Sequence, residues 1–198
     1  MKRLIVGLGN PGGRYEQTRH NLGRVVVDRL IEVGDSLPED VELAGTGWKP
    51  WASSYMNELG RPLAGYMRRN GMKPEDLLVV YDELDLPLGE LQLRRGGGAA
   101  GHKGVVSIVS ALGTPGFWRL RLGIGTPEQA RREIPSEVFV LRPFDGGETD
   151  EVVCLRAGGR CRFTGLGQAL HRVLADRLQH HEVGLSSVSL MPLYEALL

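Results

Sequence analysis

The chain has 198 residues, 24 of them Lys or Arg and 24 Asp or Glu, so its formal net charge is zero. This length suits one domain, 41% hydrophobic residues are typical of a soluble globular protein, and zero net charge excludes a global field that attracts nucleic acid. No apolar run approaches the roughly 20 residues of a membrane span, and Cys154 and Cys161 lack the CxxC spacing of a zinc site or disulfide framework. We therefore expect a soluble, cytoplasmic protein.

The first recognisable feature is the stretch GLGNPGGRYEQTRHNLG at residues 7–23, which follows a short apolar run, Leu4 to Val6, that predicts a buried strand. Its glycines and proline force a sharp turn, which places Asn10 at the carboxyl end of the strand. Open α/β sheets bind their ligands at that end. His20 follows just before a helical pattern and is a candidate general base, because histidine titrates near neutrality.

The same stretch contains G-x-G-x-x-G, the spacing of a dinucleotide-binding turn. In that motif the last glycine leads directly into a helix that receives the pyrophosphate. Here the loop continues through Pro11, Gly12 and Gly13, and the acid expected about 20 residues on has only Asp28, inside a helical pattern. A nucleotide-dependent enzyme is therefore the least favoured hypothesis.

A helix is predicted after His20, with Asn21 or Thr18 as its cap and Gly34 at its end. Its expected core-facing stripe consists of Val25, Val26, Leu30 and Ile31. A weak strand is expected near Val41 to Leu43, and Trp48 and Trp51 are expected to cover the edge of the core. A second helix begins near Ser54 and continues through Leu59, Leu63, Tyr66 and Met67 at helical spacing, which puts Asn57 in its first turn.

The apolar run Leu77 to Tyr81 does not alternate, which predicts a central strand buried on both faces. Three carboxylates follow within four residues, from Asp82 to Asp85. They are either a solvated acidic turn or the position from which one carboxylate orients a histidine ring. The position at a strand end favours the second interpretation.

The next predicted elements are a strand at Leu91 to Arg94, a small-residue loop at Gly96 to Gly104, a helix at Val105 to Leu112 and a strand at Arg119 to Gly125. Seven basic residues against one acid lie between residues 92 and 132. Such a run forms either a solvated face or a phosphate-binding surface.

Five motifs occur in order, GLGNPGGRYEQTRHNLG, YMNELG, YDELDLPLG, GGGAAGHKG and FWRLRLGIG. Together they resemble bacterial peptidyl-tRNA hydrolases over roughly residues 1–143. The resemblance implies one α/β domain over residues 1–198, a twisted mixed β-sheet with helices on both faces. It also implies hydrolysis of the ester between a peptide and the terminal ribose of tRNA, by a monomer without metal or organic cofactor.

The resemblance also implies roles for individual residues. His20 matches the catalytic histidine and Asp82 its acidic partner. The residues that match substrate-contacting positions are Asn10, Tyr15, Met56, Asn57, His102 and Lys103. Arg94 and Arg121 match the basic positions that bind the acceptor-stem phosphate. In this scheme the imidazole takes a proton from water, the carboxylate fixes its tautomer, and the amides donate to water or the oxyanion.

Two departures from the family pattern stand out. The glycine-rich loop ends His102-Lys103-Gly104, where the family has asparagine in place of Lys103, and residues 145–198 diverge from the family's C-terminal helix. Lysine cannot accept a hydrogen bond, although it offers a further contact to phosphate. The alternative to an active hydrolase is therefore an RNA-binding protein on the same scaffold with little or no hydrolytic activity.

Overall fold

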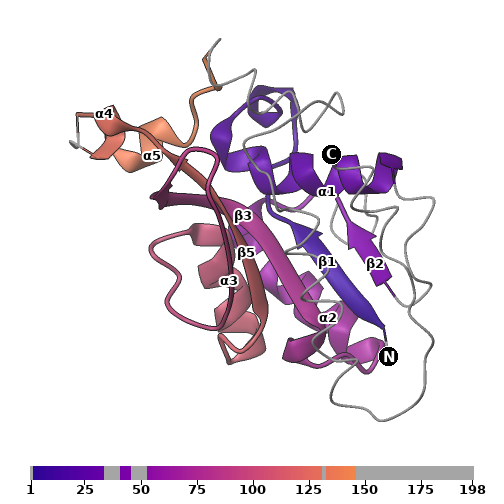
Figure 1. Ribbon diagram of the computed structural model, residues 1–198. Coiled ribbons are helices and arrows are strands. Elements are labelled where there is room, and N and C mark those ends of the chain that lie inside the picture. The colour runs from indigo at the N-terminus through magenta and orange to yellow at the C-terminus, as the bar shows by residue number, and fades with distance from the viewer. Residues whose placement is uncertain (1, 34–40, 46–52, 131–132, 146–198) are drawn as a thin grey trace, which may run out of the picture.

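The computed structural model describes residues 2–33, 41–45, 53–130 and 133–145 (Figure 1). The expectations for Gly34, Trp48, Trp51 and the segment 146–198 lie outside these residues. Among the described helices, none has the length and apolar character needed to cross a bilayer.

A five-stranded sheet forms the centre of the described part, in the order β2-β1-β3-β5-β4. Its strands are β1 (Arg3–Gly7), β2 (Val41–Ala44), β3 (Leu77–Pro87), β4 (Leu91–Arg95) and β5 (Trp118–Gly125). The pairs β1–β2, β1–β3 and β3–β5 are parallel, whereas β4 runs antiparallel to β5. The mixed sheet predicted from the sequence is confirmed.

Helices cover both faces of this sheet (Figure 1). On one face α1 (Leu22–Val33) packs with Val26 and Leu30 against Ile5 and Leu78. On the other face α2 (Gly60–Arg69) and α3 (Lys103–Leu112) pack with Leu63 and Ile108 against the sheet. The remaining elements are short: α4 (Pro127–Ala130), α5 (Ser136–Phe139) and the 3-10 turns η1 (Gly13–Tyr15), η2 (Arg19–Asn21), η3 (Met56–Glu58) and η4 (Pro74–Asp76).

The helix after His20 is confirmed, but its predicted core stripe is partly wrong. Ile31 is 48% exposed and Val25 is only half-buried, whereas Leu22 and Val27 are fully buried. Val25, Val26 and Val27 are consecutive, so the sequence alone allowed two choices of the helix face that turns toward the core. Packing against the sheet selects the phase that begins at Leu22.

Strand β3 is longer than the apolar run predicted. It continues through the acidic residues to Pro87, because β5 pairs with it as far as Gly125. Strand β1 ends earlier, with Gly7 opposite Val80. Asp82 therefore lies inside β3, two residues beyond the level at which the neighbouring β1 stops. The strand end predicted at Tyr81 is wrong, and of the two interpretations of the acidic residues the solvated turn is not found at Asp82.

Candidate active site

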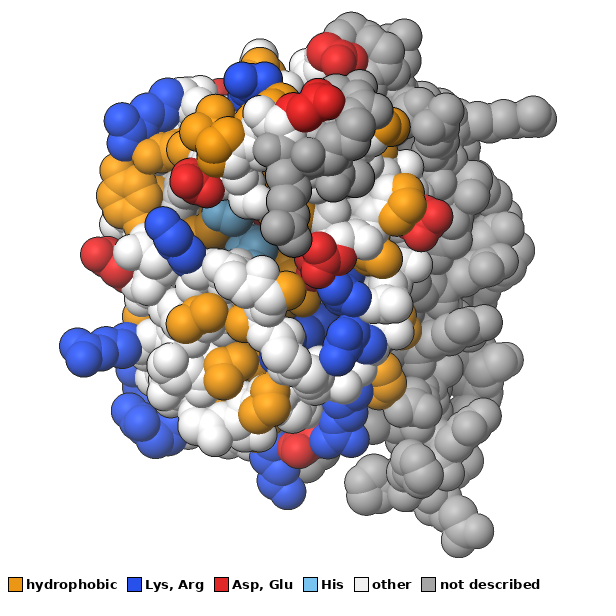
Figure 2. Space-filling model, turned by 90° about the vertical axis from the view of Figure 1, so that its left-hand side faces the viewer, with side chains coloured by type: hydrophobic (Ala, Val, Ile, Leu, Met, Phe, Trp, Pro, Cys, Tyr) orange, Lys and Arg blue, Asp and Glu red, His pale blue; other side chains and the backbone are white. Residues whose placement is uncertain are grey.

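A cleft of about 680 Å³ opens at the carboxyl ends of β1 and β3. The two imidazole rings of the described residues lie in the hollow of this face, with carboxylates and basic side chains around it (Figure 2). Of the residues predicted from the sequence, eight line the cleft: Asn10, Tyr15, His20, Met56, Asn57, Asp82, His102 and Lys103. Segments far apart in the chain thus meet at one edge of the sheet, as predicted for an α/β fold.

His20 and Asp82 form a hydrogen-bonded pair in this cleft. The Nδ1 atom of His20 lies 3.0 Å from Oδ1 and 2.9 Å from Oδ2 of Asp82. The Asp82 side chain is 2% exposed and the His20 side chain 13% exposed, so the carboxylate is almost sealed from solvent and the imidazole is the more accessible of the two. An ionised carboxylate accepts only, which places the proton on Nδ1 and leaves the Nε2 lone pair free to act as a base.

Backbone contacts hold His20 at this distance. Its turn, η2, precedes α1 directly, and the His20 amide donates to the carbonyl of Val140, 2.9 Å away. Helix α1 approaches β3 so closely that a Cβ on Gly23 would lie 2.1 Å from the Val80 carbonyl oxygen. Any larger residue at position 23 would move the helix, and the imidazole with it, away from Asp82.

His102 donates to the same carboxylate from the other side. Its Nε2 lies 3.1 Å from Asp82 Oδ1, while its Nδ1 accepts from the Val105 amide at 3.3 Å. The two imidazole rings are 4.8 Å apart between centroids. Because both ring nitrogens of His102 are engaged within the protein, this ring supports Asp82 and has no free nitrogen to offer as a base.

The double hydrogen bonding determines the charge on Asp82. Burial alone would oppose ionisation, but the nearby His102, together with hydrogen bonds from His102 and His20, outweighs it and holds the pKa of Asp82 far below its usual range. Asp82 therefore stays ionised at neutral pH, as required of a group that orients an imidazole.

Asn10 is held so that its amide nitrogen is available. Its side-chain Oδ1 accepts from the Met56 amide at 3.0 Å. Its backbone is fixed by Asn21, whose Oδ1 accepts from the Asn10 amide at 2.8 Å and whose Nδ2 donates to the Asn10 carbonyl at 2.9 Å. Because the side-chain oxygen Oδ1 is already hydrogen-bonded, the side-chain nitrogen Nδ2 of Asn10 is the group that can donate into the cleft.

The remaining predicted residues form the walls. Tyr15 packs edge-on against Tyr55 with ring centroids 6.2 Å apart, and Arg14 lies over the Tyr15 ring at 4.6 Å. Asn57 is exposed at the rim. The aromatic pair offers flat apolar surface of the kind on which a base or a side chain stacks.

The two arginines predicted to bind phosphate lie outside the group that lines the cleft. Arg121 pairs with Glu83, with Nε at 2.9 Å and Nη2 at 2.7 Å from Oε2, and also donates to Gln92. The guanidinium of Arg94 lies against the glycine-rich loop, where a Cβ on Gly97 would lie 1.7 Å from its Nη2. The charge of Arg121 is thus compensated by a carboxylate, and Arg94 packs under the loop.

His20, Asp82 and His102 also form the one grouping of metal-ligand side chains found in the described residues, with ligand atoms within 4.8 Å of one another. Both imidazoles direct a ring nitrogen at the carboxylate at 2.9–3.1 Å. These are the lengths of N–H···O hydrogen bonds. The arrangement matches a hydrogen-bonded acid–base site.

Sequence reasoning missed several contributors. Asn21 was expected as a helix cap, but its side chain clamps the Asn10 backbone instead. Val140 and Leu141 after α5 line the cleft and add an apolar wall. The guanidinium of Arg19 ties this segment down, lying 4.4 Å from the Phe139 ring and donating to the Pro143 carbonyl. The one feature of the sequence that could have indicated this role of Asn21 is its position directly after His20.

Comparison with known proteins gives a consistent family. Residues 4–161 match the family model described as peptidyl-tRNA hydrolase. The chain is 40% identical to a peptidyl-tRNA hydrolase of Moorella thermoacetica, over 89% of this chain and 97% of that one. It is 48% identical to one of Thermus thermophilus, over 71% and 76%. A crystal structure of peptidyl-tRNA hydrolase from Acinetobacter baumannii superposes with a TM-score of 0.61 at 30% identity, covering 87% of this chain and 94% of that one.

Proposed function

The chain belongs to the peptidyl-tRNA hydrolase family, and from this premise we propose that His20 is the general base that activates water for ester cleavage. The observation that supports this role is the contact of 2.9 Å between His20 Nδ1 and the buried, ionised Asp82. The opposite ring nitrogen, Nε2, has no hydrogen-bond partner among the described residues, and the His20 side chain lines the cleft that would receive substrate and water.

The proposed reaction needs no covalent intermediate, because an ester is an activated acyl group. His20 Nε2 removes a proton from water as the water attacks the ester carbonyl. Asp82 stabilises the imidazolium that forms, and the amide nitrogen of Asn10 donates to the water or to the developing oxyanion. As the ester C–O bond breaks, the proton passes from the His20 imidazolium to the departing ribose oxygen, which releases the peptide acid and free tRNA.

Substrate contacts follow from the cleft walls. We assign the terminal adenosine and the adjoining peptide to the surface of Tyr15, Met56 and Asn57, and the acceptor-stem phosphate to Arg94 and Arg121, which lie outside the cleft. The substrate is peptidyl-tRNA released by ribosomes, so the protein acts in the cytoplasm. We propose that it acts as a monomer formed by a single domain, residues 1–198.

The alternative, an RNA-binding protein without turnover, is not favoured, because the relatives carry the hydrolase name and the acid–base pair is intact. The deciding experiment is release of N-acetylated amino acid from tRNA by the purified protein. We expect His20→Ala to lower kcat by about 10²–10⁴-fold, the usual worth of general-base catalysis. A protein that binds RNA tightly but cleaves no ester at any pH would contradict the proposal.

A further inference from the structure

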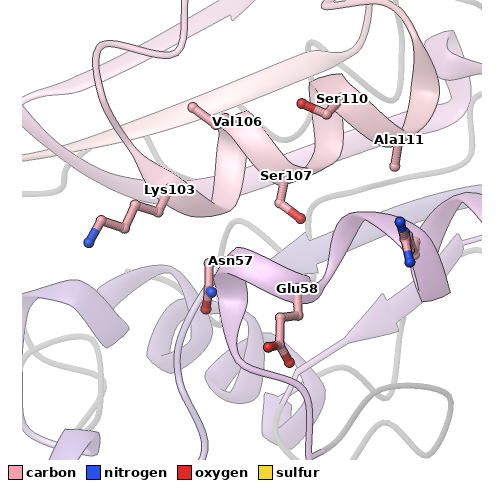
Figure 3. A pocket seen from close by; sticks show the side chains of 8 residues that line it. Asn57, Glu58, Lys103, Val106, Ser107, Ser110 and Ala111 are labelled. Atoms are coloured by element: carbon pink, nitrogen blue, oxygen red, sulfur yellow. The ribbon is translucent and has the colours of Figure 1, made fainter.

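A second hollow adjoins the catalytic cleft on the α2–α3 side of the molecule (Figure 3). It has a volume of about 800 Å³ and lies between α3 and the segment formed by η3 and α2. Asn57 and Lys103 line both hollows, so the two are continuous. We propose that this second hollow, which we call the α2–α3 hollow, binds a backbone phosphate of the RNA strand that carries the ester.

The two helices that border the α2–α3 hollow are closely packed against each other. The Gly60 amide donates to Ser107 Oγ at 3.0 Å, and a Cβ on Gly60 would lie only 2.0 Å from the Ser107 carbonyl oxygen. The hydroxyl of Ser107 points toward the η3–α2 segment in Figure 3 and keeps its own proton to donate. Close packing at Gly60 and Ser107 therefore fixes the spacing of the two helices that border the hollow.

The charge of the α2–α3 hollow is net positive. Arg61 and Lys103 are exposed at its margins, and no ion pair joins either of them to a carboxylate of the described residues. Glu58 is the single acid among the lining residues. Two cations with one carboxylate leave an uncompensated positive charge, unlike Arg121, whose charge Glu83 compensates.

Helix stability does not account for Lys103. The residue is the first of α3, where the partial positive charge of the helix dipole disfavours a cation. A lysine that opposes the dipole and faces a hollow beside the catalytic cleft is explained by an anionic ligand, and the substrate's RNA strand is polyanionic.

This inference rests on the hydrolase function proposed above, so the test compares two substrates of the unmodified and variant proteins. One is N-acetyl-aminoacyl-tRNA; the other is the same ester on adenosine, which has no phosphate. Cleavage of the adenosine ester by the wild-type protein tests the hydrolase function independently. The ratio of kcat/KM for the two substrates then tests the α2–α3 hollow alone.

We expect Arg61→Gln and Lys103→Gln each to lower this tRNA-to-adenosine ratio by about 2- to 5-fold, the usual worth of an exposed ionic contact. Each is also expected to reduce the slope of log KM against log salt by about 0.7, the value for one phosphate of a single strand. Glu58→Gln is expected to raise the ratio. The matched control is Arg68→Gln, because Arg68 is an exposed arginine on α2, the helix of Arg61, and does not line the hollow.

An equal loss on both substrates, or no loss on either, would overturn the proposal. A loss that depends on the acidity of the esterified peptide, with the salt slope unchanged, would also overturn it and assign the hollow to the peptide. Thermal unfolding of each variant separates these outcomes from misfolding. Lys103 and Arg61 belong to different helices, α3 and α2, so if one variant fails to fold the other still provides the test.

Discussion

Replacing Asp82 by asparagine tests the acid–base arrangement most directly. The carboxylate accepts from His20 Nδ1 at 3.0 Å on Oδ1 and 2.9 Å on Oδ2, and from His102 Nε2 at 3.1 Å on Oδ1. An amide has one acceptor and one donor end. In either orientation its NH₂ group lies within hydrogen-bond distance of His20 Nδ1, where it can only donate, so we expect it to favour the other tautomer of His20, with the proton on Nε2. That nitrogen then faces the cleft as a donor and cannot take a proton from water.

The expected loss is about 10²–10⁴-fold in kcat, since the whole contribution of the general base disappears. KM is expected to change by less than about threefold, because no predicted substrate contact is removed. The assay is single-turnover release of N-acetylated amino acid from tRNA. Asp85→Asn is the matched control: Asp85 lies on the same strand, lines the same cleft and is exposed, and the same charge is removed.

We expect Asp85→Asn to stay within about twofold of the wild type, as is usual for an exposed carboxylate. Two results would refute the tautomer argument: retention of more than a tenth of kcat by Asp82→Asn, or an equal loss in Asp85→Asn. Nitrogen-15 chemical shifts of His20 report directly which ring nitrogen carries the proton in each variant.

Three further predictions concern the second imidazole, metals and the far side of the sheet. His102→Ala is expected to raise the pKa of Asp82, measured by carbon-13 NMR, and to lower kcat by about tenfold, the equivalent of one hydrogen bond to a charged group. Treatment with 1,10-phenanthroline is expected to leave the rate unchanged, whereas a loss reversed by added metal would contradict a metal-free mechanism. Tyr66 donates to Glu42, and burial, this hydrogen bond and the Glu42 charge raise the pKa of Tyr66 to about 12. The contribution of the Tyr66–Glu42 hydrogen bond to folding stability is therefore complete below about pH 10 and is lost as the pH rises toward 12. We expect Tyr66→Phe to lower Tm by about 2–4 °C at pH 7 and to leave kcat unchanged.

The strands at the centre of the sheet were predictable because both of their faces are buried. Leu77 to Tyr81 and Leu4 to Val6 are unbroken apolar runs, and a segment with two buried faces has no position for a polar residue. The location of His20 was also predictable. A glycine-rich turn after the first strand must carry the chain to the helix over the carboxyl edge of the sheet, where Asp82 also lies.

The contacts that complete the site were not predictable, because they depend on distances between segments. His102 lies 20 residues from Asp82, and nothing in the loop indicates that both of its ring nitrogens are used internally. Asn21 has the composition of a helix cap, and only the tertiary position of Asn10 makes it a backbone clamp. The end of β3 was misjudged for the same reason, since pairing with β5 keeps acidic residues in the strand.

The direction of the hydrogen bonds at Asp82 assigns unequal roles to two similar histidines. His102 Nδ1 accepts from the Val105 amide, and its Nε2–H donates to Asp82, so this ring is held as a donor to the carboxylate. His20 donates only its Nδ1–H to Asp82, so the lone pair on Nε2 remains available to accept a proton from water. Lys103 follows the fixed ring and lines the continuous hollows beyond it. We therefore expect substitutions of Lys103 to change KM, and substitutions of His20 or Asp82 to change kcat.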